Sequence, residues 1–168
     1  SNVHVLGALK QAGFGPKHPW IQKILRFLQR MRTGDLFWLD KWHASPYYPT
    51  SHAIINLECT TERPELIEDA VFWMLVTQRK NGGWGYYSQP TAEETAYCVQ
   101  ALAFVLRQAC YNSRLMRATR DALKHGADWL AEHTEPPYPP LWIGKCLYSP
   151  QLVIRSAVLS ALKMATDA

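Results

Sequence analysis

The sequence predicts a single all-α domain over residues 1–168, in which inner and outer helices form a partial α-barrel, an α/α-toroid. Three observations favour this fold. Apolar residues recur at helical spacing along most of the chain, and no segment alternates convincingly as a half-buried strand would. Helices with one polar face alternate with helices that have almost none, and a helix that is apolar all round must be covered on every side. The loops that follow the amphipathic helices also resemble one another, as an internal repeat requires.

Breaker residues and apolar stripes predict the first three of about seven helices. The first reaches about Ala12, where Gly, Phe, Gly and Pro in succession interrupt the helical pattern. The second covers about residues 17–32 and has its basic residues opposite an apolar stripe, so one face would meet water. The third starts near Pro49 or Thr50 and is largely apolar.

The next three helices have clearer signals at their ends. The fourth covers about residues 64–78 and begins with a proline, which is favourable at a first helical position. The fifth covers about residues 91–109. Thr91, with Glu94 three positions later, forms a capping box that satisfies free amides at the helix start. The sixth, about residues 113–133, has an apolar stripe opposite a basic face.

The seventh helix, about residues 150–164, is apolar on nearly all sides, as are the third and the fifth. Helices two, four and six each keep a polar face. We therefore expect helices two, four and six to form an outer layer, and helices three, five and seven an inner layer in which neighbours cover them completely.

Tryptophans in the loops after the outer helices support a repeat. Trp38 and Trp84 are 46 residues apart, and Trp142 follows after a further 58 residues, so the period would drift around 50. The alternative is coincidence in a chain with seven tryptophans. Three tryptophans on the outer helices themselves are expected to pack into the core, namely Trp20, Trp73 and Trp129.

The charge distribution argues against a nucleic-acid partner. The net charge is +4, and the basic residues are scattered along the chain. Arg114, Arg117, Arg120 and Lys124 would share one helix face, but a solvated outer face explains this spacing better than a surface for nucleic acid does.

The cysteines, Cys59, Cys98, Cys110 and Cys146, show no CxxC spacing and stand among apolar residues. We expect reduced core residues rather than a disulfide or zinc framework. No apolar run approaches the ~20 residues that cross a bilayer, and no signal peptide opens the chain, so we expect no transmembrane segment and a cytoplasmic location. Residues 1–9 already carry a helical pattern, so we expect an upstream segment to be missing.

The segment from Gln78 to Trp84, QRKNGGW, closely resembles the QW motif of triterpene and diterpene cyclases. Its two glycines allow a tight turn, and the indole would cover the end of an outer helix. The resemblance implies that Gln78 and Trp84 stabilise the fold and take no part in catalysis.

Further stretches lie in the order found in bacterial class II diterpene cyclases. They cover residues 2–9, 39–48, 91–97 and 141–148, and together with the QW-like segment they span nearly the whole chain. The chain is thus similar to the C-terminal part of the acid-bearing, β-type helical domain of copalyl-diphosphate-synthase-like cyclases, which are related to squalene-hopene cyclase.

The resemblance implies the chemistry of a class II diterpene cyclase, which is an isomerase. Such an enzyme would protonate geranylgeranyl diphosphate and guide the carbocation to a copalyl-type bicyclic diphosphate. An Asp-x-Asp-Asp motif supplies the acid in the family, and the present sequence contains none. We expect that motif just upstream of residue 1, so this chain alone would be inactive. Its partners would be the isoprenoid diphosphate, the missing upstream segment and a second helical domain.

Several residues would form the wall of the cavity. Lys41 and Lys145 would contact the diphosphate at the cavity mouth, unless each is a surface lysine whose stem covers an indole. Six aromatic residues would cluster at one end of the toroid and either line the cavity or pack as core, namely Trp42, Tyr47, Tyr48, Tyr97, Trp142 and Tyr148.

Two pairs of polar residues have open interpretations. Asn2 and His4 would face the cavity as a base or a water-holding pair that ends the cation reaction, unless His4 is a hydrogen-bonded core histidine. Glu93 and Glu94 are expected to be ionised capping carboxylates, with Glu94 the stronger candidate.

No metal ligand is predicted within the chain. His43 and His52 have no cysteine at a spacing that would complete a zinc site, which disfavours the related zinc-dependent protein prenyltransferases. The resemblance implies Mg²⁺, bound to the substrate diphosphate or outside this chain.

Two alternatives to the diterpene cyclase stay open. One is a squalene-hopene or drimenyl-type cyclase that acts on a substrate of another chain length, because the sequence does not show cavity depth. The other is a non-catalytic α/α-toroid that serves as a scaffold, which the absent acid motif favours.

Overall fold

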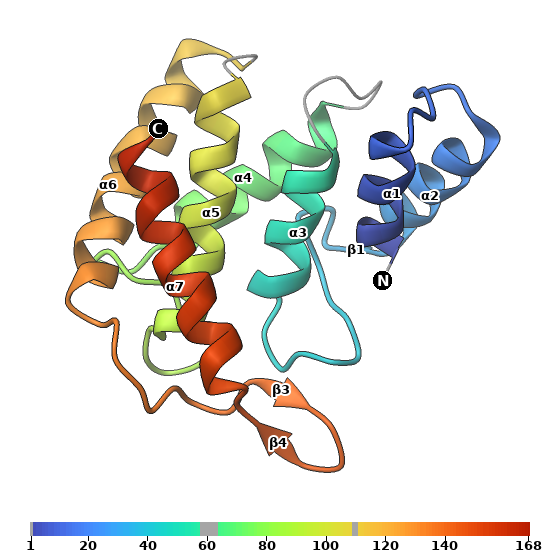
Figure 1. Ribbon diagram of the computed structural model, residues 1–168. Coiled ribbons are helices and arrows are strands. Elements are labelled where there is room, and N and C mark those ends of the chain that lie inside the picture. The colour runs from blue at the N-terminus through green and yellow to red at the C-terminus, as the bar shows by residue number, and fades with distance from the viewer. Residues whose placement is uncertain (1, 58–63, 109–110) are drawn as a thin grey trace.

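The structure is a computed structural model that describes residues 2–57, 64–108 and 111–168. Helices dominate these residues, as the sequence predicts (Figure 1). In chain order they are α1 (Asn2–Gln11), α2 (Pro19–Arg30), α3 (Tyr47–Leu57), α4 (Glu65–Thr77), α5 (Ala92–Gln108), α6 (Ser113–Ala131) and α7 (Gln151–Thr166).

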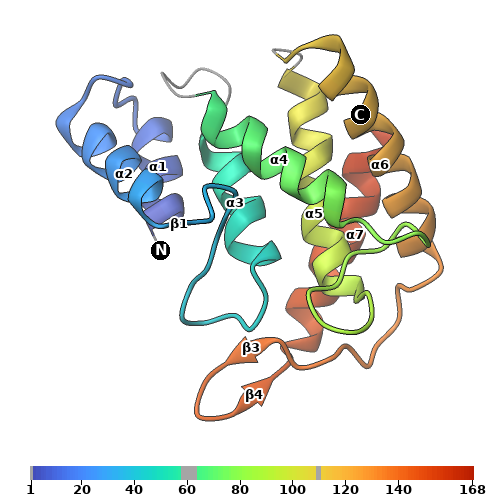
Figure 2. The ribbon, with the colours of Figure 1, turned by 180° about the vertical axis from the view of Figure 1, so that it is seen from behind.

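The helices form two layers that curve as an open arc. Helices α1, α3, α5 and α7 contact one another in that order and form the inner layer, while α2, α4 and α6 pack behind α1, α3 and α5. Seen from behind, α4 and α6 cover the inner layer, and the chain ends lie toward opposite sides of the arc (Figure 2). The all-α, two-layer prediction is therefore confirmed.

The inner helices α5 and α7 differ in how much of their surface is buried. Helix α5 is buried along nearly its whole length, as a helix without a polar face should be. Helix α7 differs from the prediction, because Leu152, Val153 and Leu159 are exposed and only one face packs on α5 and α6. The apolar outer face of α7 has no neighbour among the described residues.

Two short hairpins, absent from the prediction, join the layers. Strand β1 (Arg32–Thr33) pairs with β2 (Phe37–Trp38), and β3 (Trp142–Ile143) pairs with β4 (Leu147–Tyr148), both antiparallel. Two residues per strand are too few for a period-two pattern to be recognised. The first hairpin also explains why α2 ends before residue 32.

Trp38 and Trp84 occupy equivalent positions in two successive repeats. Each indole Nε1 donates a 2.8 Å hydrogen bond to a carbonyl ten residues earlier, Leu28 O and Met74 O, in the last turn of an outer helix. Each backbone amide also donates to a threonine hydroxyl of the following inner helix. The acceptor is Thr50 for Trp38, at 3.0 Å, and Thr95 for Trp84, at 2.9 Å. The structure thus confirms the predicted 46-residue repeat between Trp38 and Trp84.

The position six residues before each tryptophan joins one outer helix to the next. Gln78 Nε2 donates to Gly82 O in its own turn and to Ala122 O of α6, both at 2.8 Å. Arg32, 46 residues earlier, donates to Asp69 of α4 at 2.8 Å, and its guanidinium lies 5.8 Å from the Trp38 ring centre. Both residues fasten adjacent outer helices, which is the structural role that the QW resemblance implies for Gln78.

Trp142 does not belong to this series, so the 58-residue step is no repeat. Its indole donates to the side chain of Glu93 rather than to a helix end. Among the outer-helix tryptophans, Trp73 is buried as expected. Trp129 is only partly buried and stacks on His133. Trp20 contradicts the prediction, since it is 57% exposed.

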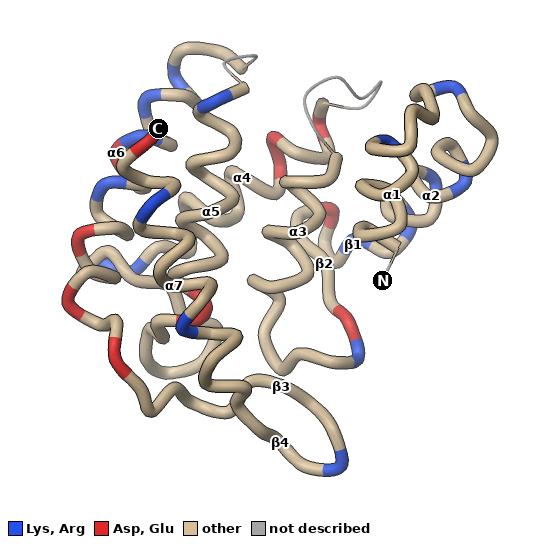
Figure 3. Tube along the Cα trace, viewed as in Figure 1, with Lys and Arg blue, Asp and Glu red and all other residues tan. Residues whose placement is uncertain are grey.

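The surface predictions have mixed outcomes. The basic residues of α6 point away from the core as expected, and Figure 3 shows Lys and Arg along that helix. Cys98 is buried but Cys146 is exposed, which corrects the expectation of a core cysteine there, and Cys59 and Cys110 lie outside the described residues. None of the helices described is long and apolar enough to span a membrane.

Candidate active-site wall

Three segments that are distant in sequence meet at the amino-terminal ends of α3 and α5. The loop of residues 39–46 precedes α3, and the β3–β4 hairpin lies against this loop. Two 2.8 Å backbone hydrogen bonds join them, from Ala44 N to Leu141 O and from Ile143 N to Trp42 O. The loop and the hairpin therefore hold their side chains at one end of the inner layer.

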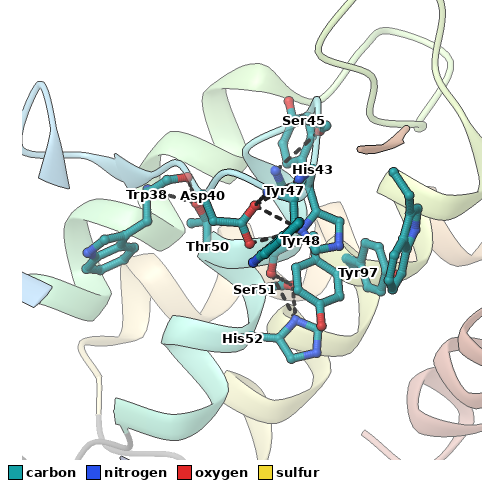
Figure 4. A network of polar contacts seen from close by, with 12 residues as sticks. Trp38, Asp40, His43, Ser45, Tyr47, Tyr48, Thr50, Ser51, His52 and Tyr97 are labelled. Atoms are coloured by element: carbon teal, nitrogen blue, oxygen red, sulfur yellow. Dashed lines mark hydrogen bonds and ion pairs between the residues drawn. The ribbon is translucent and has the colours of Figure 1, made fainter. Parts of the chain in front are cut away.

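Asp40 fixes the orientation of His43 at this junction. Its carboxylate accepts the backbone amides of Trp42 and His43 at 2.9 Å and lies 2.9 Å from His43 Nδ1 (Figure 4). Burial alone would raise the pKa of Asp40, but the hydrogen bonds from His43 and Trp42 outweigh it and hold the pKa below its ordinary value. An ionised carboxylate only accepts, so Nδ1 carries a hydrogen, and in the neutral form of the ring Nε2 presents a lone pair.

Aromatic rings surround this histidine. The ring of Tyr48 stacks on His43 with 3.7 Å between centres. Tyr97 and Trp142 approach Tyr48 edge-on, at 5.1 and 5.7 Å, and Tyr148 lies 6.2 Å from Trp142. Four of the six predicted aromatic residues thus come together as one group, which we call the aromatic wall: Tyr48, Tyr97, Trp142 and Tyr148.

Glu93 lies behind the aromatic wall with only 2% of its surface exposed. Its Oε1 accepts hydrogen bonds from Trp142 Nε1 at 2.6 Å and from the Tyr97 hydroxyl at 3.3 Å. Burial raises the pKa of Glu93 to about 7, although both hydrogen bonds oppose this. The prediction of an ionised cap at Glu93 is wrong, because its side chain turns away from the helix start and toward the hairpin.

Glu94 behaves as the capping prediction requires. Its amide donates to Thr91 Oγ1 at 3.1 Å, and its carboxylate accepts the Thr91 hydroxyl at 2.8 Å. The same carboxylate accepts the Ser45 hydroxyl at 2.6 Å and the Tyr86 amide at 2.9 Å, so it ties two loops to the helix start. Burial raises the pKa of Glu94 in spite of these contacts, which counts against its expected full ionisation.

His52 is a neutral histidine on the same side of α3. Its Nδ1 lies 2.9 Å from Tyr48 O and therefore carries a hydrogen, because a carbonyl oxygen only accepts. Burial lowers the pKa of His52 to about 4. The rings of Tyr48 and His4 lie 4.2 and 5.0 Å from it, and Figure 4 shows His52 next to Tyr48.

A cavity of about 520 Å³ opens beside these residues. Asn2 and His4 of α1 line it, with Asp40 and Tyr48 on its other sides. Both α1 side chains are exposed, and burial lowers the pKa of His4. The structure thus places the predicted Asn2 and His4 at a cavity, as expected for a base or water-holding pair, and that role stays a prediction.

The remaining predicted residues take different positions. Tyr47 does not line the cavity; it is buried against Trp73 of α4, with ring centres 4.7 Å apart. Trp42 borders the cavity, and Lys41 Nζ lies 4.5 Å from the centre of its ring. Lys145 is exposed in the turn between β3 and β4.

The contacts of Asp40, His43 and Glu93 were not predicted from the sequence. Asp40 and His43 stand three positions apart, a spacing that allows a carboxylate to cap a turn and bond the imidazole. No local signal pointed to Glu93, since its partner Trp142 lies 49 residues later. Among the described residues no group of three or more His, Cys, Asp and Glu side chains is arranged to hold a metal ion.

The amino-acid sequence of this chain is similar to those of known cyclases. The family model of the squalene-hopene cyclase C-terminal domain matches residues 2–139. A type B diterpene cyclase of Mycobacterium tuberculosis is 44% identical over 99% of this chain and 32% of its own length. An ent-copalyl diphosphate synthase of a Streptomyces species is 35% identical over 96% of this chain and 32% of its own.

A labda-7,13-dienyl diphosphate synthase of Streptomyces clavuligerus is 32% identical over 97% of this chain and 30% of its own length. The chain therefore spans about a third of the length of these curated relatives. The match runs through every element described above except the β3–β4 hairpin and α7 in the family model, and the relatives extend it to nearly the whole chain.

Proposed function

Because the chain belongs to the squalene-hopene cyclase C-terminal domain family, and so to the class II terpene cyclases, we propose that it forms one wall of the active site of a longer diterpene cyclase. The parent reaction is the protonation-initiated cyclisation of geranylgeranyl diphosphate to a copalyl-type bicyclic diphosphate. The enzyme is then an isomerase, because the diphosphate is retained. Relatives named copalyl and labda-7,13-dienyl diphosphate synthases support this choice of reaction.

The observation that carries the proposal is the aromatic wall beside the cavity. Tyr48 borders the cavity, and the rings of Tyr97 and Trp142 pack around it. Aromatic faces attract a cation through their quadrupoles, by about 0.5–2 kcal/mol for each ring. The polar tips of Tyr97 and Trp142 both donate to Glu93, which fixes the orientation of the two rings in the wall.

The proton that starts the reaction comes, in this proposal, from a segment outside the chain. The sequence has no Asp-x-Asp-Asp motif. Asp40, the carboxyl group that borders the cavity, is a poor acid there, because its hydrogen bonds hold its pKa low and keep it ionised. The chain alone would then be unable to begin cyclisation.

Lys41 is our candidate contact for the substrate diphosphate. It borders the cavity, and the stacked Trp42 holds its ammonium group near the rim. Lys145, on the exposed hairpin turn, is the second candidate. The described residues offer no carboxylate cluster for Mg²⁺. The ion would arrive with the diphosphate, and we assign no step to it.

Incubation of the full-length protein with geranylgeranyl diphosphate and Mg²⁺ tests the proposal. We expect a bicyclic diphosphate, identified after phosphatase treatment. Recovery of unchanged substrate would refute the choice of substrate. Conversion of squalene or of a shorter diphosphate in a parallel reaction would favour another cyclase of the family, and no conversion of any of them would favour a scaffold.

Substitution at Tyr48 tests the role of the wall. We expect Tyr48→Leu to lower kcat about 10-fold, the loss of up to about 2 kcal/mol of cation stabilisation, while Tyr48→Phe keeps most activity because its ring face remains. Tyr86→Leu is the matched control, since Tyr86 is exposed and lines none of the cavity. Equal losses in Tyr48→Leu and Tyr48→Phe would contradict a role for the aromatic face.

A further inference from the structure

Two buried polar atoms of the site have no hydrogen-bond partner among the described residues. They are His43 Nε2 and Glu93 Oε2. Only 7% of His43 and 2% of Glu93 is exposed, so bulk water does not reach them. Leaving a buried polar group unpaired is unfavourable by about 1–3 kcal/mol, so two such atoms in one place require an explanation.

The two side chains line the same small void. Its volume is about 10 Å³, close to the smallest space that holds one water molecule. Two hydroxyl groups among the lining residues are already bonded: the Ser45 hydroxyl donates to Glu94, and the Tyr97 hydroxyl donates to Glu93 Oε1. The unpaired atoms of His43 and Glu93 are therefore buried groups available to bind a molecule in the void.

The two atoms are chemically complementary. The Asp40 carboxylate holds a hydrogen of His43 on Nδ1, so in the neutral form of the ring Nε2 is an acceptor. On Glu93, Oε1 accepts from Trp142 and Tyr97, and burial favours the protonated carboxyl group, so the proton belongs on Oε2. A donor and an acceptor thus border one void of the size of a water molecule.

We propose that a single buried water bridges Glu93 Oε2 and His43 Nε2 and that Asp40, His43, this water and Glu93 form a proton relay in the wall of the cavity. Glu93 Oε2 gives its proton to the water oxygen while the water gives one of its own protons to His43 Nε2. The net change is one proton moved from Glu93 to His43. Asp40 stabilises the imidazolium, and Trp142 and Tyr97 stabilise the new carboxylate through bonds that already exist.

The relay matters for a cationic reaction because it moves negative charge toward the aromatic wall. A carboxylate forms on Glu93, directly behind Trp142 and Tyr97, only when the proton has moved. This consequence rests on the proposed function, whereas the water and the proton transfer do not. The ionisable groups that face the pair are Asp40 from the loop, Glu94 and Tyr97 from α5, Tyr48 and His52 from α3, and His4 from α1.

A crystal structure of the full-length protein tests the water directly. We expect one ordered water within hydrogen-bond distance of His43 Nε2 and Glu93 Oε2. A direct hydrogen bond between the two side chains, or an empty void, would overturn the bridging water. This measurement needs no substrate, so its outcome is independent of whether the protein cyclises geranylgeranyl diphosphate.

Infrared difference spectroscopy of the full-length protein tests the proton. The carboxylic-acid stretch of Glu93 should be present below pH 7, be absent from Glu93→Gln, and shift in His43→Asn, which changes the partner of the bridging water. Glu94 contributes equally to the wild type and to Glu93→Gln, so it cancels in the difference. An ionised Glu93 at pH 5, or a band insensitive to His43→Asn, would overturn the relay.

Kinetics separate a relay from a purely structural contact. With the substrate of the full-length enzyme, Glu93→Gln should lower kcat on the order of tenfold and remove an inflection near neutral pH, with KM little changed. Glu135→Gln, at an exposed carboxylate, is the control and should change neither. An unchanged pH profile in Glu93→Gln would overturn the relay. If the water and the Glu93 band are found but no substrate is converted, the proposed function fails and the relay stands.

Discussion

Glu93 and its neighbour Glu94 differ because their side chains leave the same helix start in different directions. Glu94 receives hydrogen bonds from two hydroxyls and an amide. Glu93 receives bonds from Trp142 and Tyr97 on only one of its oxygens, so burial dominates and its pKa rises to about 7. The charge of each carboxyl group follows from its partners and not from its place in the sequence.

The raised pKa of Glu93 predicts a change of stability with pH. The folded pKa lies above the unfolded value of 4.5, so the folded state binds the proton more tightly. The contribution of Glu93 to the free energy of unfolding is then highest below pH 4.5. It falls as pH rises toward 7, by about 3 kcal/mol in total. We expect Glu93→Gln to remove this contribution, as measured by urea unfolding of wild type and variant at pH 5 and pH 8. A stability difference between wild type and variant that is the same at both pH values would contradict this.

His52 predicts the opposite slope. Its folded pKa of about 4 lies below the unfolded value of 6.5, so the unfolded state binds the proton more tightly. The contribution of His52 to the free energy of unfolding is fully present above pH 6.5. It falls as pH drops toward 4, by about 3 kcal/mol. In His52→Asn, an amide can replace the Nδ1 bond to Tyr48 O without titrating, and we expect its unfolding free energy to vary less between pH 7 and pH 4. If the variant lost stability in acid as steeply as the wild type, another group would be responsible.

At the scale of helices and loops, the indole of Trp84 acts as a spacer between α4 and α6. It is fully buried and bonds the last turn of α4 through Met74 O. Gly126 of α6 faces it so closely that a Cβ there would lie 2.5 Å from Trp84 Cζ3. The close approach of these two helices therefore depends on one large side chain and one absent side chain.

We expect Gly126→Ala to destabilise the protein by about 1–3 kcal/mol, because the methyl group would overlap the indole. In a Trp84→Phe background the smaller ring relieves this overlap, so the same substitution should be less unfavourable. Thermal unfolding of the four proteins of this double-mutant cycle measures the coupling. Gly15→Ala, which meets no atom within 4 Å, is the control, and additive effects of Gly126→Ala and Trp84→Phe would refute the contact.

At the scale of the whole molecule, the arc ends at α7, and one apolar face of this helix is exposed. Leu152 is 82% exposed there, next to the exposed Val153 and Leu159, although a helix with so little polar surface is typical of a protein interior. In the longer enzyme that we propose, residues outside this chain would be available to cover this face.

We expect Leu152→Ser to destabilise the full-length protein by about 2 kcal/mol, the usual effect of unburying a leucine, despite its exposure here. Val76→Ser, at an apolar residue that is also exposed but lies on the outer helix α4, is the matched control and should change stability little. Chemical unfolding measures both. Equal and small effects would mean that α7 stays open to solvent in the complete protein.

The sequence predicts the layers of this molecule better than it predicts the site. Helix positions follow from local signals, such as the Thr91–Glu94 capping box, that the structure reproduces. The spacing places Trp142 in the repeat, because spacing alone does not show whether an indole bonds a helix end or a carboxyl group. The exposure of α7 was missed for a similar reason, since an apolar pattern does not identify the neighbour that covers it.

The backbone bonds between the loop of residues 39–46 and the β3–β4 hairpin also determine when the site can form during synthesis. The loop leaves the ribosome early, but the hairpin that supplies Trp142 emerges about 100 residues later. Until then Glu93 has no indole donor and His43 lacks one side of its enclosure. A nascent chain that stops before residue 141 therefore contains the residues that line the larger cavity, but it lacks Trp142 of the aromatic wall and Leu141 of the small void between His43 and Glu93.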